Sequence, residues 1–241
     1  MTTNHPIIQA FINPSESFHE IFEKFYNKKQ FLEATFAKLL KESGKEINQE
    51  LLNSIDQAII YGHHDANIFM LFLTYGINYF SKKHLEKAQS LCSIALSLDQ
   101  EKIQPVVKAQ LIQQKGVLQF NEGKIIECMK LFEEALSLID NKNTRYPDIL
   151  INASFISAGQ GKLKEFGLYQ VDQLNCLTRE EQFIAYTHMK IVNAFLIGNY
   201  QESCQLIDEH ELQLKGEDPE TIKLFRTLVQ IISGDFNELN Y

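Results

Sequence analysis

The sequence predicts an all-α fold built as an array of antiparallel helix pairs, and three observations lead to this class. Over most of its 241 residues, apolar side chains recur three and four positions apart, which is the spacing of one buried helix face. Alternation with a period of two, which is typical of strands, is missing from the sequence. A bend also recurs every 36 to 40 residues, so the chain is expected to build its core hairpin by hairpin.

The helical spacing is clearest in AQLIQQKGVLQF (109–120) and CMKLFEEALSLI (128–139). Similar amphipathic stretches follow one another along the chain, separated by short punctuation of Gly, Asn, Lys or Pro. They predict helices over about 15–27, 30–43, 47–61, 66–80, 84–98, 104–121, 124–139, 147–159, 162–175, 179–196, 199–212 and 218–232, with a last short turn from 235.

The recurring bend combines a turn residue, usually Gly, with a polar residue, an apolar residue and a Glu. Its copies are KKHLEKA (82–88), EGKIIEC (122–128), QGKLKEF (160–166), IGNYQES (197–203) and SGDFNEL (233–239). The Gly-Lys step in the second copy is not a phosphate loop, because that loop needs the pattern GxxxxGK[ST] after a buried strand. Instead, glycines in the last four copies are expected to end the first helix of each pair in the left-handed conformation. They are Gly123, Gly161, Gly198 and Gly234.

Small residues predict where two helices approach each other closely. Gly76 and Gly116 fall where the first helix of a pair would meet its partner. Ala88, Ala95 and Ala135 are small where the second helix would pack on its neighbours. Larger side chains would push the helices apart, which interiors packed at crystal-like density tolerate poorly.

The composition limits the class of partner. A formal charge of −8 argues against nucleic acid, because phosphate binding depends on clustered Lys and Arg. No stretch is apolar enough over sufficient length to span a bilayer, and the first residues lack a signal-peptide pattern, so we expect no membrane insertion and a cytoplasmic protein. The four cysteines are widely spaced without a CxxC pair and are expected to be reduced and buried: Cys92, Cys128, Cys176 and Cys204.

Histidine offers the clearest candidate for metal binding or catalysis, in GHHDAN (62–67). Adjacent side chains point in different directions, so a metal at His63, His64 and Asp65 would need ligands from elsewhere. We interpret the stretch as a solvated turn in which Asp65 caps the next helix. No HExxH or GxSxG pattern occurs. We therefore predict no metal, no cofactor and no catalytic residue, with an enzyme on a helical array as the alternative.

The spacing and the small residues resemble the tetratricopeptide repeat, a helix-turn-helix unit of 34 residues. Residues 69–102 match its pattern at Phe72, Gly76, Tyr79, Ala88 and Ala95. Residues 109–142 match it at Gly116, Cys128, Phe132 and Ala135. The resemblance implies a right-handed superhelical solenoid over residues 66–241, with further repeats at about 147–180, 184–217 and 220–241. Before it we expect a tail at 1–14 and N-terminal helices at 15–65 that form a degenerate repeat or a cap.

In this family, first-helix residues that flank the packing positions line a concave surface. The resemblance therefore implies a non-enzymatic module that holds a peptide or a partner helix through hydrophobic anchors, as a chaperone or an adaptor. The implied contact residues are Leu73, Ile77, Phe80, Gln113, Gln114, Val117, Phe120, Asn152, Phe155, Met189 and Val192. The open alternative is that the array, or its N-terminal helices, fills this groove, because an exposed apolar stripe of that size would promote aggregation.

Two further interpretations stay open. The acidic charge and the apolar groove are similar to those of tetratricopeptide-type chaperones that hold hydrophobic translocator proteins before type III secretion. Alternatively, the chain is a structural scaffold subunit of a larger assembly, which docks through its convex face and its termini. Either role is compatible with a homo-oligomer.

Overall fold

A computed structural model of the chain describes residues 31–41, 49–161, 180–210, 223 and 227. Within these residues every regular element is a helix, as the sequence predicts. The chain divides into two compact units, Met1–Tyr146 (unit 1) and Pro147–Tyr241 (unit 2).

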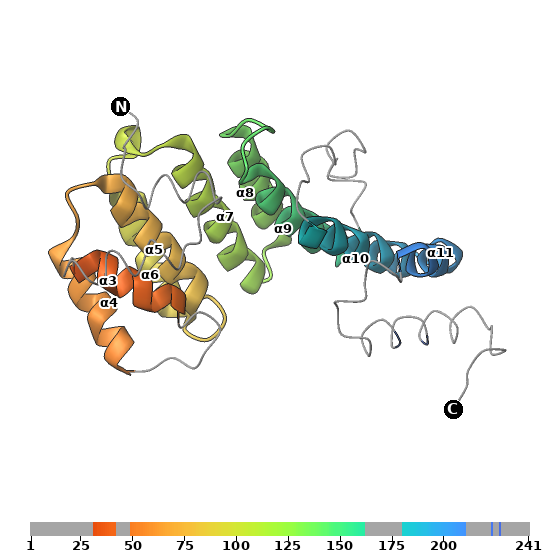
Figure 1. Cartoon of the computed structure of the whole chain (residues 1–241), viewed down its shortest axis with the longest axis horizontal. Helices are drawn as coiled ribbons and strands as arrows, with labels where there is room; N and C mark the ends of the chain where they lie inside the picture. The colour runs from red at the N-terminus through yellow and green to blue at the C-terminus, as the bar shows by residue number, and fades with distance from the viewer. Residues whose placement is uncertain (1–30, 42–48, 162–179, 211–222, 224–226, 228–241) are drawn as a thin grey trace. The chain divides into compact units, whose positions relative to one another are not determined.

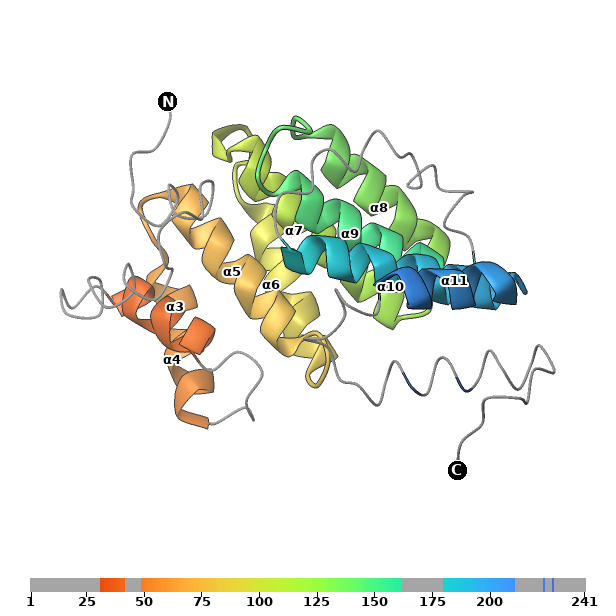
Figure 2. The ribbon, with the colours of Figure 1, turned by 45° about the vertical axis from the view of Figure 1, so that its right-hand side comes forward.

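The described part of unit 1 consists of three helix pairs that follow one another in a row (Figures 1 and 2). Its helices are α3 (Phe31–Lys41), α4 (Gln49–Tyr61), α5 (Ala66–Phe80), α6 (Leu85–Ser97), the 3₁₀ helix η1 (Gln100–Lys102), α7 (Pro105–Asn121) and α8 (Ile125–Ser137). The helix α3 packs on α4, α5 on α6, and α7 on α8. Each first helix also contacts the next first helix, α3 with α5 and α5 with α7.

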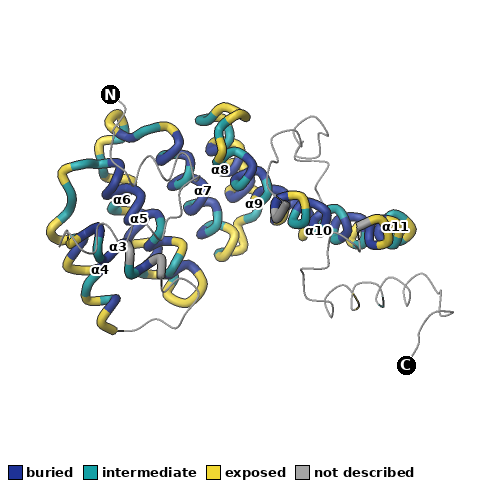
Figure 3. Tube along the Cα trace, viewed as in Figure 1, coloured by how far each residue is buried: buried dark blue, intermediate teal, exposed yellow. Residues whose placement is uncertain are grey.

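The helix α5 is the core of unit 1 and is buried over most of its surface. Its buried residues run without a gap over 67–74 and include Ile77 and Phe80 (Figure 3). A helix with this pattern must be covered on every face, and α3, α6 and α7 all contact it. Phe36 of α3 supplies part of the cover, with its ring centre 6.0 Å from that of Phe72.

Local signals set the helix ends. The Asp65 carboxylate precedes α5 and accepts hydrogen bonds from Asn67 N (2.8 Å) and Ile68 N (3.4 Å), which confirms the predicted cap. Gly123 follows α7 with φ 77°, so the predicted left-handed helix end is confirmed there. The fourth such glycine, Gly234, lies outside the described residues.

In two of the three helix pairs of unit 1, the helices approach closely at the predicted glycines. A Cβ atom on Gly116 would lie 3.0 Å from two ring carbons of Phe132 and 3.4 Å from the carbonyl oxygen of Cys128. In the preceding pair, a Cβ atom on Gly76 would lie 2.8 Å from Leu91 Cδ1. Both predictions of close approach are therefore confirmed. The small residues expected on the second helices are buried as well: Ala88, Ala95 and Ala135.

Polar side chains join the N-terminal ends of successive first helices. Glu33, in the first turn of α3, lies 3.2 Å from His63 Nε2, just before α5. Asn67, in the first turn of α5, accepts a hydrogen bond from Gln104 N (2.7 Å) and donates one to Lys102 O (3.2 Å), just before α7. These bonds link positions 30 to 37 residues apart, so they fix each pair against the next.

The described part of unit 2 contains α9 (Tyr146–Ala158), α10 (Glu180–Leu196) and α11 (Tyr200–His210). Gln182 Nε2 donates to Asp148 Oδ1 at 3.0 Å, which joins the first turns of α9 and α10. Gly161 follows α9 with φ 65°, and Gly198 follows α10 with φ 80°, as predicted. The helices α10 and α11 form a hairpin whose core is Ile191, Leu206 and Ile207.

Where both ends of a helix lie within the described residues, the predicted bounds agree with the observed ones to within two residues. The sequence did not predict η1, where the Asp99 carboxylate accepts a hydrogen bond from Glu101 N at 3.3 Å. The helices expected at 15–27 and 162–175 and the turn expected from 235 lie outside the described residues, and of the helix expected at 218–232 only Lys223 and Thr227 are described, both as helical.

Candidate partner-binding site

Several residues predicted to line a groove are buried inside the helix pairs. On α5, Leu73, Ile77 and Phe80 are completely covered, and Met189 on α10 is buried too. A partner could reach these side chains only after the surrounding helices had opened. We therefore assign them to the core rather than to a partner surface, which agrees with the alternative that the array fills its own groove.

The polar contacts expected on α7 are also enclosed. Gln113 is buried and accepts a hydrogen bond from Gln110 Nε2 at 2.7 Å. Gln114 is buried, and its Oε1 finds no hydrogen-bond partner in the described part of the chain. A buried carbonyl oxygen left unpaired costs about 1–3 kcal/mol. Neither amide is placed to contact the backbone of a partner.

The remaining predicted contact residues reach the surface. Phe120, near the C-terminal end of α7, is 37% exposed, and Phe155 on α9 is 64% exposed. Asn152 on α9 is exposed, while Val117 on α7 and Val192 on α10 are half-buried. We call Phe120 and Phe155 the open phenylalanines. They are the most exposed apolar residues of the predicted set, so a partner can cover them without disturbing the core.

The histidine turn is less exposed than the sequence indicates. His63 Nε2 lies 3.2 Å from Glu33 Oε1, and each side chain keeps less than a tenth of its surface exposed. His63 Nδ1 accepts a hydrogen bond from Asp65 N at 3.0 Å. The prediction of a solvated turn is therefore wrong for His63, because Glu33 covers its ring from a helix thirty residues earlier. His64 is exposed, as expected.

The bond to Glu33 raises the pKa of His63 above its ordinary value, while burial acts in the opposite direction. A carboxylate that orients a histidine is also a common feature of catalytic sites. Here both groups are enclosed between α3 and the turn before α5, where a substrate would have no access. The pair therefore acts as a structural contact.

The buried cysteines are unreactive thiols. Burial raises the pKa of Cys128 to about 11 and also raises the pKa of Cys92. Because the thiolate is the nucleophilic form, both side chains are protonated and inert at neutral pH. Cys204 is half-buried, and Cys176 lies outside the described residues.

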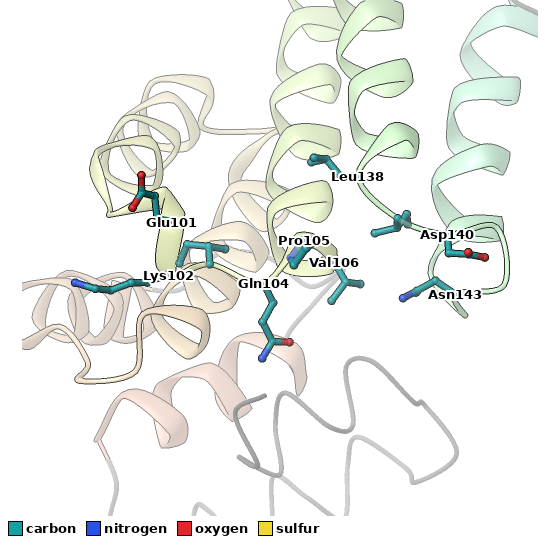
Figure 4. Close-up of a pocket in the computed structure, with 10 residues that line it drawn as sticks. Glu101, Lys102, Gln104, Pro105, Val106, Leu138, Asp140 and Asn143 are labelled. Carbon is teal, nitrogen blue, oxygen red and sulfur yellow. The ribbon is translucent and has the colours of Figure 1, made fainter. Parts of the chain in front are cut away.

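An open pocket lies at the end of unit 1 where α7 begins and α8 has just ended (Figure 4). Its volume of about 760 Å³ is within the range of ligand-binding clefts. Its aliphatic lining comes from Ile103, Pro105, Val106, Leu138 and Ile139. Its polar lining comes from Glu101, Lys102, Gln104, Asp140 and Asn143. None of these residues belongs to a sequence motif, because only folding brings 101–106 beside 138–143.

Among the residues that the structure describes, no three His, Cys, Asp or Glu side chains lie close enough together to hold a metal ion. No helix there combines the length and the apolar character that crossing a bilayer requires. Compared with protein-family models, curated proteins and solved structures, the chain matches none. The exposure of Phe120 in unit 1, the exposure of Phe155 in unit 2 and the pocket of unit 1 therefore carry the functional interpretation.

Proposed function

We propose that this protein is a non-enzymatic interaction module, a cytoplasmic chaperone or adaptor that holds a peptide or a partner helix against first helices of its array. The observation that carries the proposal is the exposure of Phe120 and Phe155 on first helices that are otherwise well buried. Both occupy positions at which the tetratricopeptide resemblance places contact residues. Exposed aromatic side chains of this kind are frequent anchors in protein interfaces.

The contacts within unit 1 support a tetratricopeptide-like arrangement as part of the proposal. Each first helix touches its own second helix and the next first helix, and α6 also touches α7. Gly76 and Gly116 provide the same close approach in two successive pairs. A right-handed solenoid of such pairs would present its first helices along one concave face.

The exposed area of the open phenylalanines gives their expected contribution to the binding free energy. An aromatic side chain buries roughly 150–250 Å² when fully covered, so exposures of 37% and 64% leave about 70 Å² on Phe120 and about 130 Å² on Phe155. At about 25 cal/mol per Å², covering them would contribute about 2 and 3 kcal/mol. Replacing either by Ala should weaken binding about tenfold or more.

Affinity capture from a lysate of the cells that make the protein tests this proposal. The wild type is compared with a Phe120→Ala/Phe155→Ala double variant and with Ile126→Ala, each shown to be folded by circular dichroism. Ile126 is a matched control because it is 67% exposed but lies on α8, a second helix.

A protein that is recovered with the wild type and with Ile126→Ala, but not with the double variant, would identify a partner of the first helices. Loss with Ile126→Ala alone would favour the scaffold alternative, which docks through its convex face and its termini, because second helices would form that convex face. Equal recovery with all three proteins would refute a contact through the open phenylalanines.

A further inference from the structure

We infer that the pocket at the start of α7 binds a peptide segment in which an aliphatic residue is flanked by Lys or Arg. This site is separate from the surface of the proposed function. Phe120 lies fifteen positions after Pro105 on α7, and at 1.5 Å per position the two residues are about 22 Å apart along the helix axis. A ligand in the pocket therefore leaves Phe120 uncovered.

The floor of the pocket suits an aliphatic side chain. Ile103 and Val106 are buried at its base, while Leu138 and Ile139 are half-buried along the opposite wall. Figure 4 shows Pro105 and Val106 between Lys102 on one side and Asp140 on the other. A leucine-sized side chain in this position would remove apolar surface of both molecules from water, which is the main source of affinity for such a contact.

The residues that line the pocket carry a net negative formal charge, because Glu101 and Asp140 outnumber Lys102. Lys102 lies in the lining, but its Nζ is 2.9 Å from Asp99 Oδ2, so its charge is already neutralised. Glu101 and Asp140 each add a carboxylate, and no ion pair joins either of them to another residue in the described ranges. Lys142 is in the same loop as Asp140 but outside the lining.

Two helix ends also face this region, and their dipoles oppose each other. The start of α7 carries roughly half a positive charge and the end of α8 roughly half a negative charge, so the two nearly cancel. The carboxylates of Glu101 and Asp140 then give the pocket a negative potential, and a cationic side chain is the complementary group.

One wall of the pocket is held by the core. The buried side chain of Asn67 bonds to Gln104 N (2.7 Å) and to Lys102 O (3.2 Å). These two bonds fix the backbone on both sides of Ile103. A wall that is already ordered costs less conformational entropy when a ligand binds.

The wall formed by residues 138–143 is ordered by hydrogen bonds within the loop that follows α8. Asp140 Oδ1 accepts a hydrogen bond from Lys142 N at 2.8 Å, and Asn143 Oδ1 accepts one from Arg145 N at 2.9 Å. Each side chain uses one oxygen to order the loop. The second oxygen of Asp140 can accept from a ligand ammonium group, and the Asn143 amide nitrogen can donate to a peptide carbonyl.

Fluorescence polarisation with short labelled peptides tests this inference. The probe is fluorescein-labelled Gly-Lys-Leu-Lys-Gly, titrated with the full chain at low ionic strength. The two comparison peptides replace both lysines by Glu, or the leucine by Gly. We expect saturable binding of the probe and at least tenfold weaker binding of both comparison peptides.

Matched variants separate the pocket from the overall charge. Glu101→Gln/Asp140→Asn should weaken binding of the probe about tenfold, since two ion pairs are lost while Asn at 140 can still accept from Lys142 N. Glu133→Gln/Glu134→Gln removes the same charge from an exposed part of α8 and should leave the affinity unchanged. The Phe120→Ala/Phe155→Ala variant should bind the probe like the wild type, so a failed partner test and a failed pocket test are distinguishable.

Several outcomes would overturn the inference. One is that the probe shows no saturable binding up to about 1 mM protein. Another is that the peptide with Glu in place of both lysines binds as tightly as the probe. The third is that Glu101→Gln/Asp140→Asn and Glu133→Gln/Glu134→Gln weaken binding of the probe equally. If the pocket variant does not fold, amide chemical shifts of the wild type decide the question. Shifts induced by the probe should cluster at the amides of residues 103, 104, 106 and 138–143, and shifts confined to other regions would contradict the site.

Discussion

Replacing Gly116 by Ala tests the close approach of α7 and α8. The new Cβ atom would lie 3.0 Å from Cδ2 and Cε2 of Phe132, whereas carbon atoms in good contact are roughly 3.5–4.0 Å apart. It would also lie 3.4 Å from the carbonyl oxygen of Cys128. The Phe132 ring is completely buried and the oxygen belongs to a helix backbone, so neither can move away freely.

Two effects of this substitution oppose each other. Ala is more favourable than Gly inside a helix by about 1 kcal/mol. Overpacking a filled core costs about 1–3 kcal/mol. The steric term should win, so we expect a net loss of about 1 kcal/mol in the free energy of unfolding. For a chain of this size, that corresponds to a melting temperature lower by about 2–4 °C.

Thermal and urea unfolding, followed by far-ultraviolet circular dichroism, measures this change. A double-mutant cycle with Phe132→Leu is the control, because a smaller side chain at 132 removes the ring edges that the Cβ atom meets. In that background Gly116→Ala should lose less stability or gain some. If Gly116→Ala alone raised stability by the full 1 kcal/mol or so of helix propensity, the close packing of α7 on α8 would be refuted.

Further predictions concern the buried polar and thiol groups. Glu33 raises the folded-state pKa of His63, so the contribution of His63 to stability should be complete below its unfolded pKa of about 6.5 and be lost as pH rises through the folded value. Urea unfolding across this pH range should show a loss of stability in the wild type that His63→Gln lacks. Identical pH profiles of the two proteins would contradict this prediction. Asn67→Ala should lower the free energy of unfolding by about 1–3 kcal/mol, because Gln104 N and Lys102 O lose their hydrogen-bond partner. An unchanged urea midpoint would show that these two hydrogen bonds do not contribute to stability. With a pKa of about 11, the buried Cys128 thiol should react with Ellman's reagent far more slowly than that of Cys204, which peptide mapping by mass spectrometry can follow; comparable rates would show that the α7–α8 pair opens readily.

Local features of this protein could be predicted from its sequence because they depend on neighbouring residues. Asp65 caps α5 through bonds to the next two or three amides, and Gly123 ends α7 through its own backbone conformation. The close approach at Gly76 and Gly116 could be predicted as well, since the two glycines recur at the period of the helix pairs.

The contacts of the binding surfaces could not be predicted in the same way. Phe80 and Phe120 lie at equivalent positions of two successive first helices, yet Phe80 is completely buried and Phe120 reaches the surface. Periodicity indicates which face of a helix is apolar, but it does not indicate whether that face meets another helix of the same chain or a partner. The apolar residues of α5 are buried because α3, α6 and α7 cover this helix on several sides.

The sequence by itself determined the all-α class, the helix bounds and the bends, because hydrophobic period and capping act within a few residues. Tertiary structure alone decided that Glu33 covers His63, thirty residues away, and that segments 101–106 and 138–143 form a pocket. Both features require residues distant in the chain to meet, and their partners carry no local pattern. They depend on how one helix pair packs on the next, which the pattern of a single helix does not encode.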